Sequence, residues 1–117
     1  MKLDGALSMR VRDGGEEAAG FEAMGLDGAW TFEAGHDPFI PLTLASQTTS
    51  RIELGAAIAG AFARSPMLSA HIAWDLQTIT EGRFILGLGT QIRPHKPAER
   101  LRAYVHAVPA IWDCWST

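Results

Sequence analysis

Cysteine is nearly absent from this 117-residue sequence, in which Cys114 is the single example. One cysteine cannot form a disulfide bond within the chain, which excludes the disulfide-stapled class of small secreted domains. Residues 1–5 also lack the apolar core of about 7 to 15 residues that a secretory signal needs. We therefore expect a cytoplasmic protein whose thiol stays reduced.

Long apolar runs and clustered positive charge are absent as well. No stretch approaches the roughly 18 consecutive apolar residues of a membrane span, so no membrane partner is expected. Ten Lys and Arg against thirteen Asp and Glu give a formal net charge of −3. Nucleic-acid binding would need a cationic surface, and the sequence has no basic tract. With 47% hydrophobic and 20% charged residues, the composition fits a globular domain and excludes a disordered chain.

Short apolar segments alternate four times with segments of helical periodicity. Strands are expected at residues 2–7, 28–32, 51–59 and 84–88, and helices at about 13–25, 41–49, 65–82 and 97–115. Repeated strand-helix units are typical of a parallel sheet with right-handed crossovers. A complete (β/α)8 barrel needs about 250 residues. The sequence therefore predicts one α/β domain over residues 1–117, a partial TIM barrel of about four βα units.

Local signals mark where several of these helices begin and end. Asp13 and Glu16 have the spacing of a capping box, and Gly25 stands where a left-handed cap ends the same helix. Pro41 suits the first turn of the second helix. Ser65, followed directly by a proline, predicts a hydroxyl N-cap for the third helix.

In parallel α/β folds the functional groups come from loops at the carboxyl ends of strands, and the loop after the second strand holds His36. A histidine at this edge can exchange a proton with a ligand near neutral pH. The alternative is a structural loop in which His36 bonds locally and Asp37 starts a turn.

The loops after the third and fourth strands are rich in small residues. Residues 56–63 allow close approach to a flat ligand, although they suit tight packing equally well. After the fourth strand, Gly87 and Gly89 can turn backbone N–H groups toward a ligand, with Thr90, Gln91 and His95 as polar neighbours. This is not the full dinucleotide-binding fingerprint. The histidines show no metal-ligand spacing and no Cys-x-x-Cys exists, so no metal site is predicted.

Taken together, several segments resemble the N-terminal part of the luciferase-like monooxygenase family. They are Gly28-Ala29-Trp30 with Glu33, His36-Asp37-Pro38-Phe39, Thr49-Ser50-Arg51-Ile52-Glu53-Leu54-Gly55, Phe62-Ala63-Arg64-Ser65-Pro66 and Gly82-Arg83-Phe84-Ile85-Leu86-Gly87-Leu88-Gly89. The run from Leu86 to His95, with Ala110-Ile111-Trp112 and Cys114-Trp115, is most similar to the deazaflavin-dependent (coenzyme F420) oxidoreductase branch. The family fold is a (β/α)8 barrel.

The resemblance implies a flavin or deazaflavin over the carboxyl ends of the strands, with coenzyme F420 first and FMN as the alternative. Hydride transfer to or from a small organic substrate would occur at its ring. By the same resemblance His36 lies close to the ring, while Ala57 and Ile58 back its face. Relatives often have a non-prolyl cis peptide at that strand end.

The next edge of the implied cofactor site consists of Gly89, Thr90 and Gln91. Some deazaflavin enzymes of the family have a proton-donating glutamate directly after the second glycine, where this sequence has Thr90. The resemblance thus leaves His36 or His95 as the catalytic acid. The four units correspond to the first half of the family barrel, so the sequence reads as an incomplete chain. The alternative function is a non-catalytic half barrel, either a fragment or an assembly module that forms a homodimer.

Overall fold

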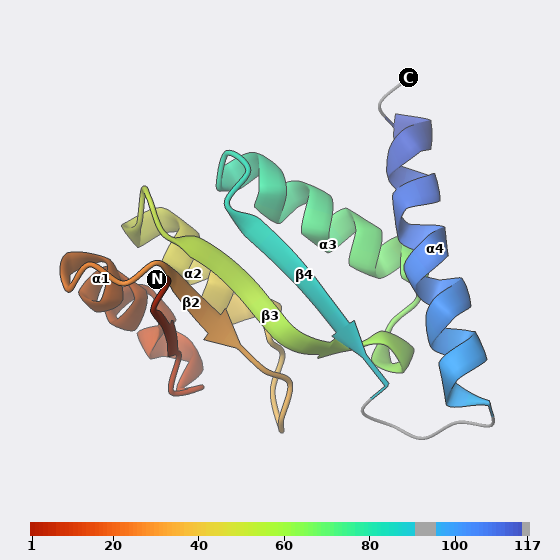
Figure 1. The fold of residues 1–117 in the computed structure, drawn as a ribbon, viewed down its shortest axis with the longest axis horizontal. Coiled ribbons are helices and arrows are strands. Elements are labelled where there is room, and N and C mark those ends of the chain that lie inside the picture. The colour runs from red at the N-terminus through yellow and green to blue at the C-terminus, as the bar shows by residue number, and fades with distance from the viewer. Residues whose placement is uncertain (91–95, 116–117) are drawn as a thin grey trace.

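Four strands lie side by side in one parallel sheet, and a helix follows each of them (Figure 1). The computed structural model describes residues 1–90 and 96–115. The elements are β1 (Asp4–Ala6), the 3₁₀ turn η1 (Val11–Asp13), α1 (Gly14–Ala23), β2 (Gly28–Thr31), α2 (Phe39–Thr48), β3 (Glu53–Gly60), the 3₁₀ turn η2 (Ala61–Ala63), α3 (Pro66–Ile79), β4 (Phe84–Gly89) and α4 (Pro97–Trp115). The predicted order of four βα units is confirmed.

The strands follow each other across the sheet in the order β1-β2-β3-β4, so each pairs with the next one along the chain. In register, Gly28 of β2 lies opposite Glu53 of β3, and Leu54 of β3 lies opposite Phe84 of β4. An irregularity interrupts the β3–β4 pairing between Ala56 and Ala59. This arrangement is the predicted half of a (β/α)8 barrel.

The core lies between the sheet and helices α1 to α3, which cover one of its faces (Figure 1). Its large buried side chains include Leu7, Leu42, Ile52, Leu54 and Leu76. Fully buried alanines on the strands and helices let the two layers approach closely. The last helix packs on α3 through a second, smaller cluster that contains Tyr104 and Val108.

Two of the predicted helix signals, Gly25 and Ser65, are confirmed, and the Asp13 capping box is wrong. Gly25 has the left-handed φ of +82° just after α1, and the hydroxyl of Ser65 accepts the N–H of Leu68 at 3.1 Å, with Pro66 as the first residue of α3. Asp13 makes no capping hydrogen bond, because its backbone is helical as the last residue of η1.

The second helix begins earlier than expected. It starts at Phe39, so Pro41 is its third residue. The first strand is also shorter than the expected segment of residues 2–7.

None of the described helices is both long and apolar enough to cross a membrane.

Candidate functional site

Strands β2, β3 and β4 end at the same edge of the sheet, where the loops that follow β2 and β3 lie side by side (Figure 1). Thr31 is the last residue of β2, Gly60 the last of β3 and Gly89 the last of β4. This edge is where parallel α/β proteins place their functional groups.

The loop from β2 to α2 is fixed where it joins the helix. The hydroxyl of Thr31 donates to the carbonyl of Pro38 at 2.9 Å. One carboxylate oxygen of Asp37 accepts the backbone N–H groups of Phe39 at 2.7 Å and Ile40 at 2.8 Å. A carboxylate at this position satisfies unpaired donors of the first helical turn and complements the helix dipole. The expectation that Asp37 starts a turn is therefore confirmed.

His36 lies in an open hollow beside this helix start. The hollow measures about 490 Å³ and is lined by Glu33, Ala34, Gly35, His36, Asp37, Ala63 and Arg64. Its imidazole is half-buried, and the Nδ1 atom is buried with no hydrogen-bond partner among the described residues. Within the described part of the chain, Nδ1 thus makes no local hydrogen bond of the kind that a purely structural loop would use. A buried polar atom in this state is costly unless a ligand or water meets it.

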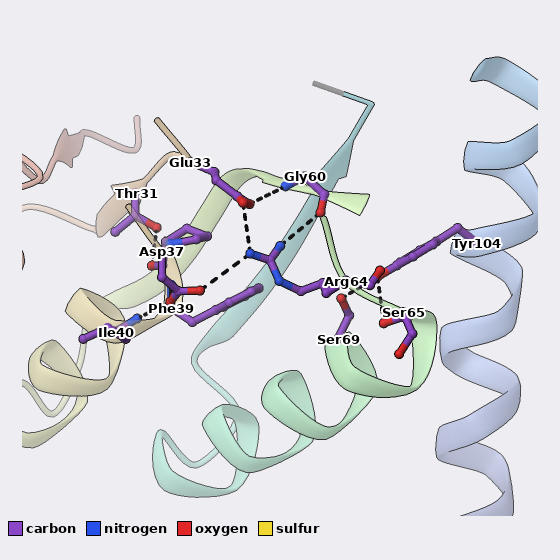
Figure 2. Close-up of polar contacts among 11 residues, drawn as sticks. Thr31, Glu33, Asp37, Phe39, Ile40, Gly60, Arg64, Ser65, Ser69 and Tyr104 are labelled. Atoms are coloured by element: carbon purple, nitrogen blue, oxygen red, sulfur yellow. Dashed lines mark hydrogen bonds and ion pairs between the residues drawn. The ribbon is translucent and has the colours of Figure 1, made fainter. Parts of the chain in front are cut away.

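Arg64 connects the loops after β2 and β3 (Figure 2). Its guanidinium lies 3.0 Å from Glu33 Oε2 and 3.6 Å from Asp37 Oδ1, and it donates to the carbonyl of Gly60 at 3.0 Å. The cation also lies over the ring of Phe39, 5.1 Å from its centroid. Two carboxylates thus balance one buried cation at the edge of the sheet.

Glu33 is the most buried carboxylate of this cluster, with 14% of its side chain exposed. Its Oε1 atom accepts the N–H of Gly60 at 2.9 Å. Burial raises the pKa of Glu33, but the Arg64 guanidinium and the Gly60 N–H outweigh it and hold that pKa below its ordinary value. Glu33 is therefore ionised at neutral pH and acts as a hydrogen-bond acceptor.

A cis peptide bond joins Ala57 to Ile58, as the family resemblance implied. Both residues are exposed, Ile58 to 38%. The carbonyl of Ile58 accepts the N–H of Glu33 at 3.2 Å, and the Ile58 side chain lies against the backbone of Gly89, where a Cβ atom would collide with it. Strand β3 thereby contacts both the β2 loop and the end of β4.

The structure brings some of the predicted site residues together and leaves others apart. Ile58 and Gly89 are in contact, and Thr90 follows Gly89 in a half-buried position. None of these residues, nor Ala57, lines the hollow that holds His36. Gln91 and His95 lie outside the described residues.

Sequence reasoning missed the roles of Arg64 and Glu33. Their signal was available: opposite charges stand in two loops that a parallel sheet places at one edge. Elsewhere, the ring of His71 on α3 lies 4.8 Å from that of Trp115 on α4. Within residues 1–90 and 96–115, no three His, Cys, Asp or Glu side chains gather as a metal site would need.

The sequence is similar to a family and to several curated proteins. The luciferase-like monooxygenase family matches residues 2–113. The uncharacterized protein Rv1360 of Mycobacterium tuberculosis is 51% identical over 98% of this chain and 37% of its own length. The putative coenzyme F420-dependent oxidoreductase Rv3520c of the same organism is 35% identical over 83% of this chain and 31% of its length. The chain thus spans less than two fifths of these relatives.

Solved structures share the fold. The oxygenating constituent of 3,6-diketocamphane monooxygenase from Pseudomonas putida, in complex with FMN, has a TM-score of 0.83 at 18% identity, covering 96% of this chain and 40% of that one. The coenzyme F420-dependent tetrahydromethanopterin reductase of Methanopyrus kandleri has a TM-score of 0.69 at 24% identity, covering 86% and 29%. At these identities the similarity establishes a common fold.

Proposed function

Because this chain belongs to the luciferase-like monooxygenase family, we propose that it forms the histidine-bearing half of a flavin- or deazaflavin-dependent oxidoreductase. The reaction transfers a hydride between the cofactor and a small organic substrate. Coenzyme F420 is the first choice of cofactor because the relative Rv3520c is named a putative coenzyme F420-dependent oxidoreductase. FMN is the alternative because it is bound in the structure of the diketocamphane enzyme.

The residues at the carboxyl ends of the strands fit a flat, hydrogen-bonding ring. The observation that carries the proposal is the buried Nδ1 of His36, which has no partner among the described residues. Ile58, exposed to 38%, offers an apolar surface at the same edge of the sheet. The cofactor-binding set is His36, Ala57, Ile58, Gly89, Thr90 and Gln91.

When bound, a flavin or deazaflavin supplies a site that accepts and releases a hydride. The chain contributes the group that handles the proton, and His36 is the candidate, since an imidazole can both donate and accept a proton. Glu33 does not serve as the acid, because its lowered pKa keeps it ionised. His95 is the second candidate by the family resemblance.

Cofactor titration tests this function directly. The purified chain is titrated with coenzyme F420 and, separately, with FMN, while cofactor fluorescence is followed. We expect saturable binding of one of them, and at least tenfold weaker binding by His36→Ala. His106→Ala is the matched control, because His106 is exposed on α4, and it should bind like the unchanged chain. A folded chain that binds neither cofactor contradicts the proposal.

A second candidate is assembly into a homodimer. Among the described residues, no strand pairs with the outer edge of β1 or of β4. Ile85, exposed to 37%, pairs in register with Gly55 and so lies on the sheet face that carries Trp30. Such an apolar face and open edges favour association.

The mass in solution tests the homodimer. Sedimentation equilibrium should give twice the chain mass, and Ile85→Lys should return it to the monomer while the circular dichroism spectrum stays unchanged. A monomer at high concentration would exclude this candidate.

A further inference from the structure

We propose that Arg64 is a positioning residue, which holds the loop of His36 in the shape that binds the cofactor. This inference rests on the function proposed above. Arg64 makes no hydrogen bond with the Nδ1 atom of His36; it acts on the backbone that carries the imidazole.

The geometry places one cation at both ends of the histidine segment (Figure 2). Glu33 and Asp37 are separated by only three residues, and the Arg64 guanidinium lies 3.0 Å from the first carboxylate and 3.6 Å from the second. The chain from Glu33 to Asp37 therefore forms a short arch over a single charge. Because Glu33 and Asp37 are both held at the ends of so short a segment, the conformations open to His36 between them are restricted.

The same cation ties this arch to the neighbouring strand. One guanidinium nitrogen of Arg64 donates to the carbonyl of Gly60 at the end of β3, and the N–H of Gly60 donates to Glu33. Only 9% of the Arg64 side chain is exposed, so solvent weakens these contacts little. A planar guanidinium offers several donors in fixed directions, whereas a lysine ammonium is a single point charge. Arg64→Lys therefore keeps the charge and loses the simultaneous contacts.

Tyr104 of α4 fixes the backbone from which Arg64 projects. Its hydroxyl lies 2.9 Å from the carbonyl of Arg64, 3.0 Å from that of Ser65 and 2.6 Å from the hydroxyl of Ser69. A carbonyl can only accept, so the single tyrosine proton goes to these carbonyls and Ser69 donates to Tyr104. Tyr104 of α4 thus helps to fix the position of the Arg64 guanidinium through the backbone of Arg64.

The chain offers a matched control at the opposite end of the sheet. Arg83 donates to the carbonyls of Thr80 at 3.0 Å, Ile52 at 2.8 Å and Thr49 at 3.2 Å. It precedes β4, whereas Arg64 follows β3. Arg83→Lys therefore removes a comparable set of hydrogen bonds without touching the arch, and reports the effect of lost stability alone.

Amide hydrogen exchange, read by NMR on the full chain, is the test. In Arg64→Lys we expect the amides of residues 34–37 to exchange at least tenfold faster, with less than a twofold change in Arg83→Lys. Glu33→Gln keeps the arginine and removes the carboxylate at one end of the arch, so it should behave like Arg64→Lys. It replaces Arg64→Lys in the test if that variant does not fold. Equal changes in the Arg64 and Arg83 variants, or no change in residues 34–37, would overturn the proposal.

Affinity adds a second readout that separates this inference from the proposed function. If the unchanged chain binds FMN or F420, Arg64→Lys should weaken that binding at least tenfold and Arg83→Lys less than twofold, at a temperature where both are folded. Unaltered affinity in Arg64→Lys would overturn the positioning role. If the unchanged chain binds neither cofactor, the proposed function fails, and the exchange rates still decide whether Arg64 holds the loop.

Discussion

The indole of Trp30 lies on Gly55, its register partner in the neighbouring strand. A Cβ atom at Gly55 would lie 2.7 Å from Cε3 and 2.8 Å from Cη2 of that indole, closer than real Cβ contacts. The ring has little freedom to move away, because its Nε1 donates to Asp4 Oδ2 at 2.9 Å. Gly55 is therefore required by the large side chain beside it.

Gly55→Ala should destabilise the fold by about 2 kcal/mol, because the added methyl group forces the indole out of its position. Urea denaturation followed by circular dichroism measures the effect. Gly20→Ala is the control: no atom lies within 4 Å of a Cβ there, and the site is exposed within α1. That control should be more stable by about 0.5 to 1 kcal/mol. Equal stabilities of the two variants would contradict the assigned role of Trp30.

Glu33→Gln should lower the stability at neutral pH by about 2 kcal/mol, because a charge-assisted hydrogen bond to buried Arg64 is lost. The pKa of Glu33 is held below the ordinary 4.5, so its stabilising contribution is complete above that pH. The contribution disappears as the pH falls through the lowered pKa of the folded state. The difference in unfolding free energy between the unchanged chain and Glu33→Gln should therefore vanish in acid.

Unfolding free energies measured from pH 7 down to pH 2 check the Glu33 prediction. Glu22 also has a lowered pKa: burial raises it, but the N–H groups of Arg51, Ile52 and Ser50 outweigh that effect. Protonation of Glu22 in acid lowers the unfolding free energy of both proteins equally. This effect therefore cancels in the difference between their unfolding free energies. A gap that stays constant through the acid range would show that Glu33 is not ionised in the folded chain.

Tyr104→Phe should cost about 1 to 2 kcal/mol at pH 7, because the carbonyls of Arg64 and Ser65 lose their donor. Burial raises the pKa of Tyr104 above 10.0, although the bond from Ser69 opposes this. The unfolded chain then loses the phenolic proton first, so the contribution of Tyr104 is present below pH 10 and falls as the pH rises toward the folded pKa.

Tyrosinate absorbance provides the measurement, because the sequence has a single tyrosine. The pH midpoint of tyrosinate formation should be higher in the folded chain than in the chain unfolded in urea. The difference in unfolding free energy between the unchanged chain and Tyr104→Phe should narrow above pH 10. A folded midpoint at or below the unfolded one would refute the buried, hydrogen-bonded state of the hydroxyl.

Ser65→Ala should lose about 1 kcal/mol, because the N–H of Leu68 loses the oxygen that caps α3. Ser65→Asp keeps an acceptor at this position and should retain most of the stability. Thermal unfolding of the three proteins gives the comparison. A loss shared equally by the alanine and aspartate variants would mean that the cap contributes nothing.

Local signals in the sequence predicted the fold well where the structure depends on neighbouring residues. Ser65 and Gly25 are examples, since an N-cap and a left-handed turn are decided within a few positions. The Asp13 capping box failed because η1 gives this residue a helical backbone, and its carboxylate lies 3.8 Å from Arg10 instead. A capping residue needs an extended backbone, which spacing alone does not reveal.

The candidate site was predictable in position but not in its contacts. The alternation of strands and helices placed His36 at the carboxyl edge of the sheet, where the structure has it. The contacts of Arg64 with Glu33 depend on how two distant loops lie beside each other, and that follows from the β2–β3 register. Opposite charges in these two loops were the available signal, but the sequence does not specify the register that makes Glu33 and Arg64 meet.

Sequential pairing in the sheet has a consequence for how the chain reaches its structure. Each strand from β2 onward pairs with the strand that precedes it, so every βα unit finds its template already synthesised when it leaves the ribosome. Pairing of each strand with its predecessor allows growth by addition of one unit at a time during translation. Stalled nascent chains of increasing length should therefore gain protease resistance in steps of one βα unit, beginning at the N-terminal strand pair.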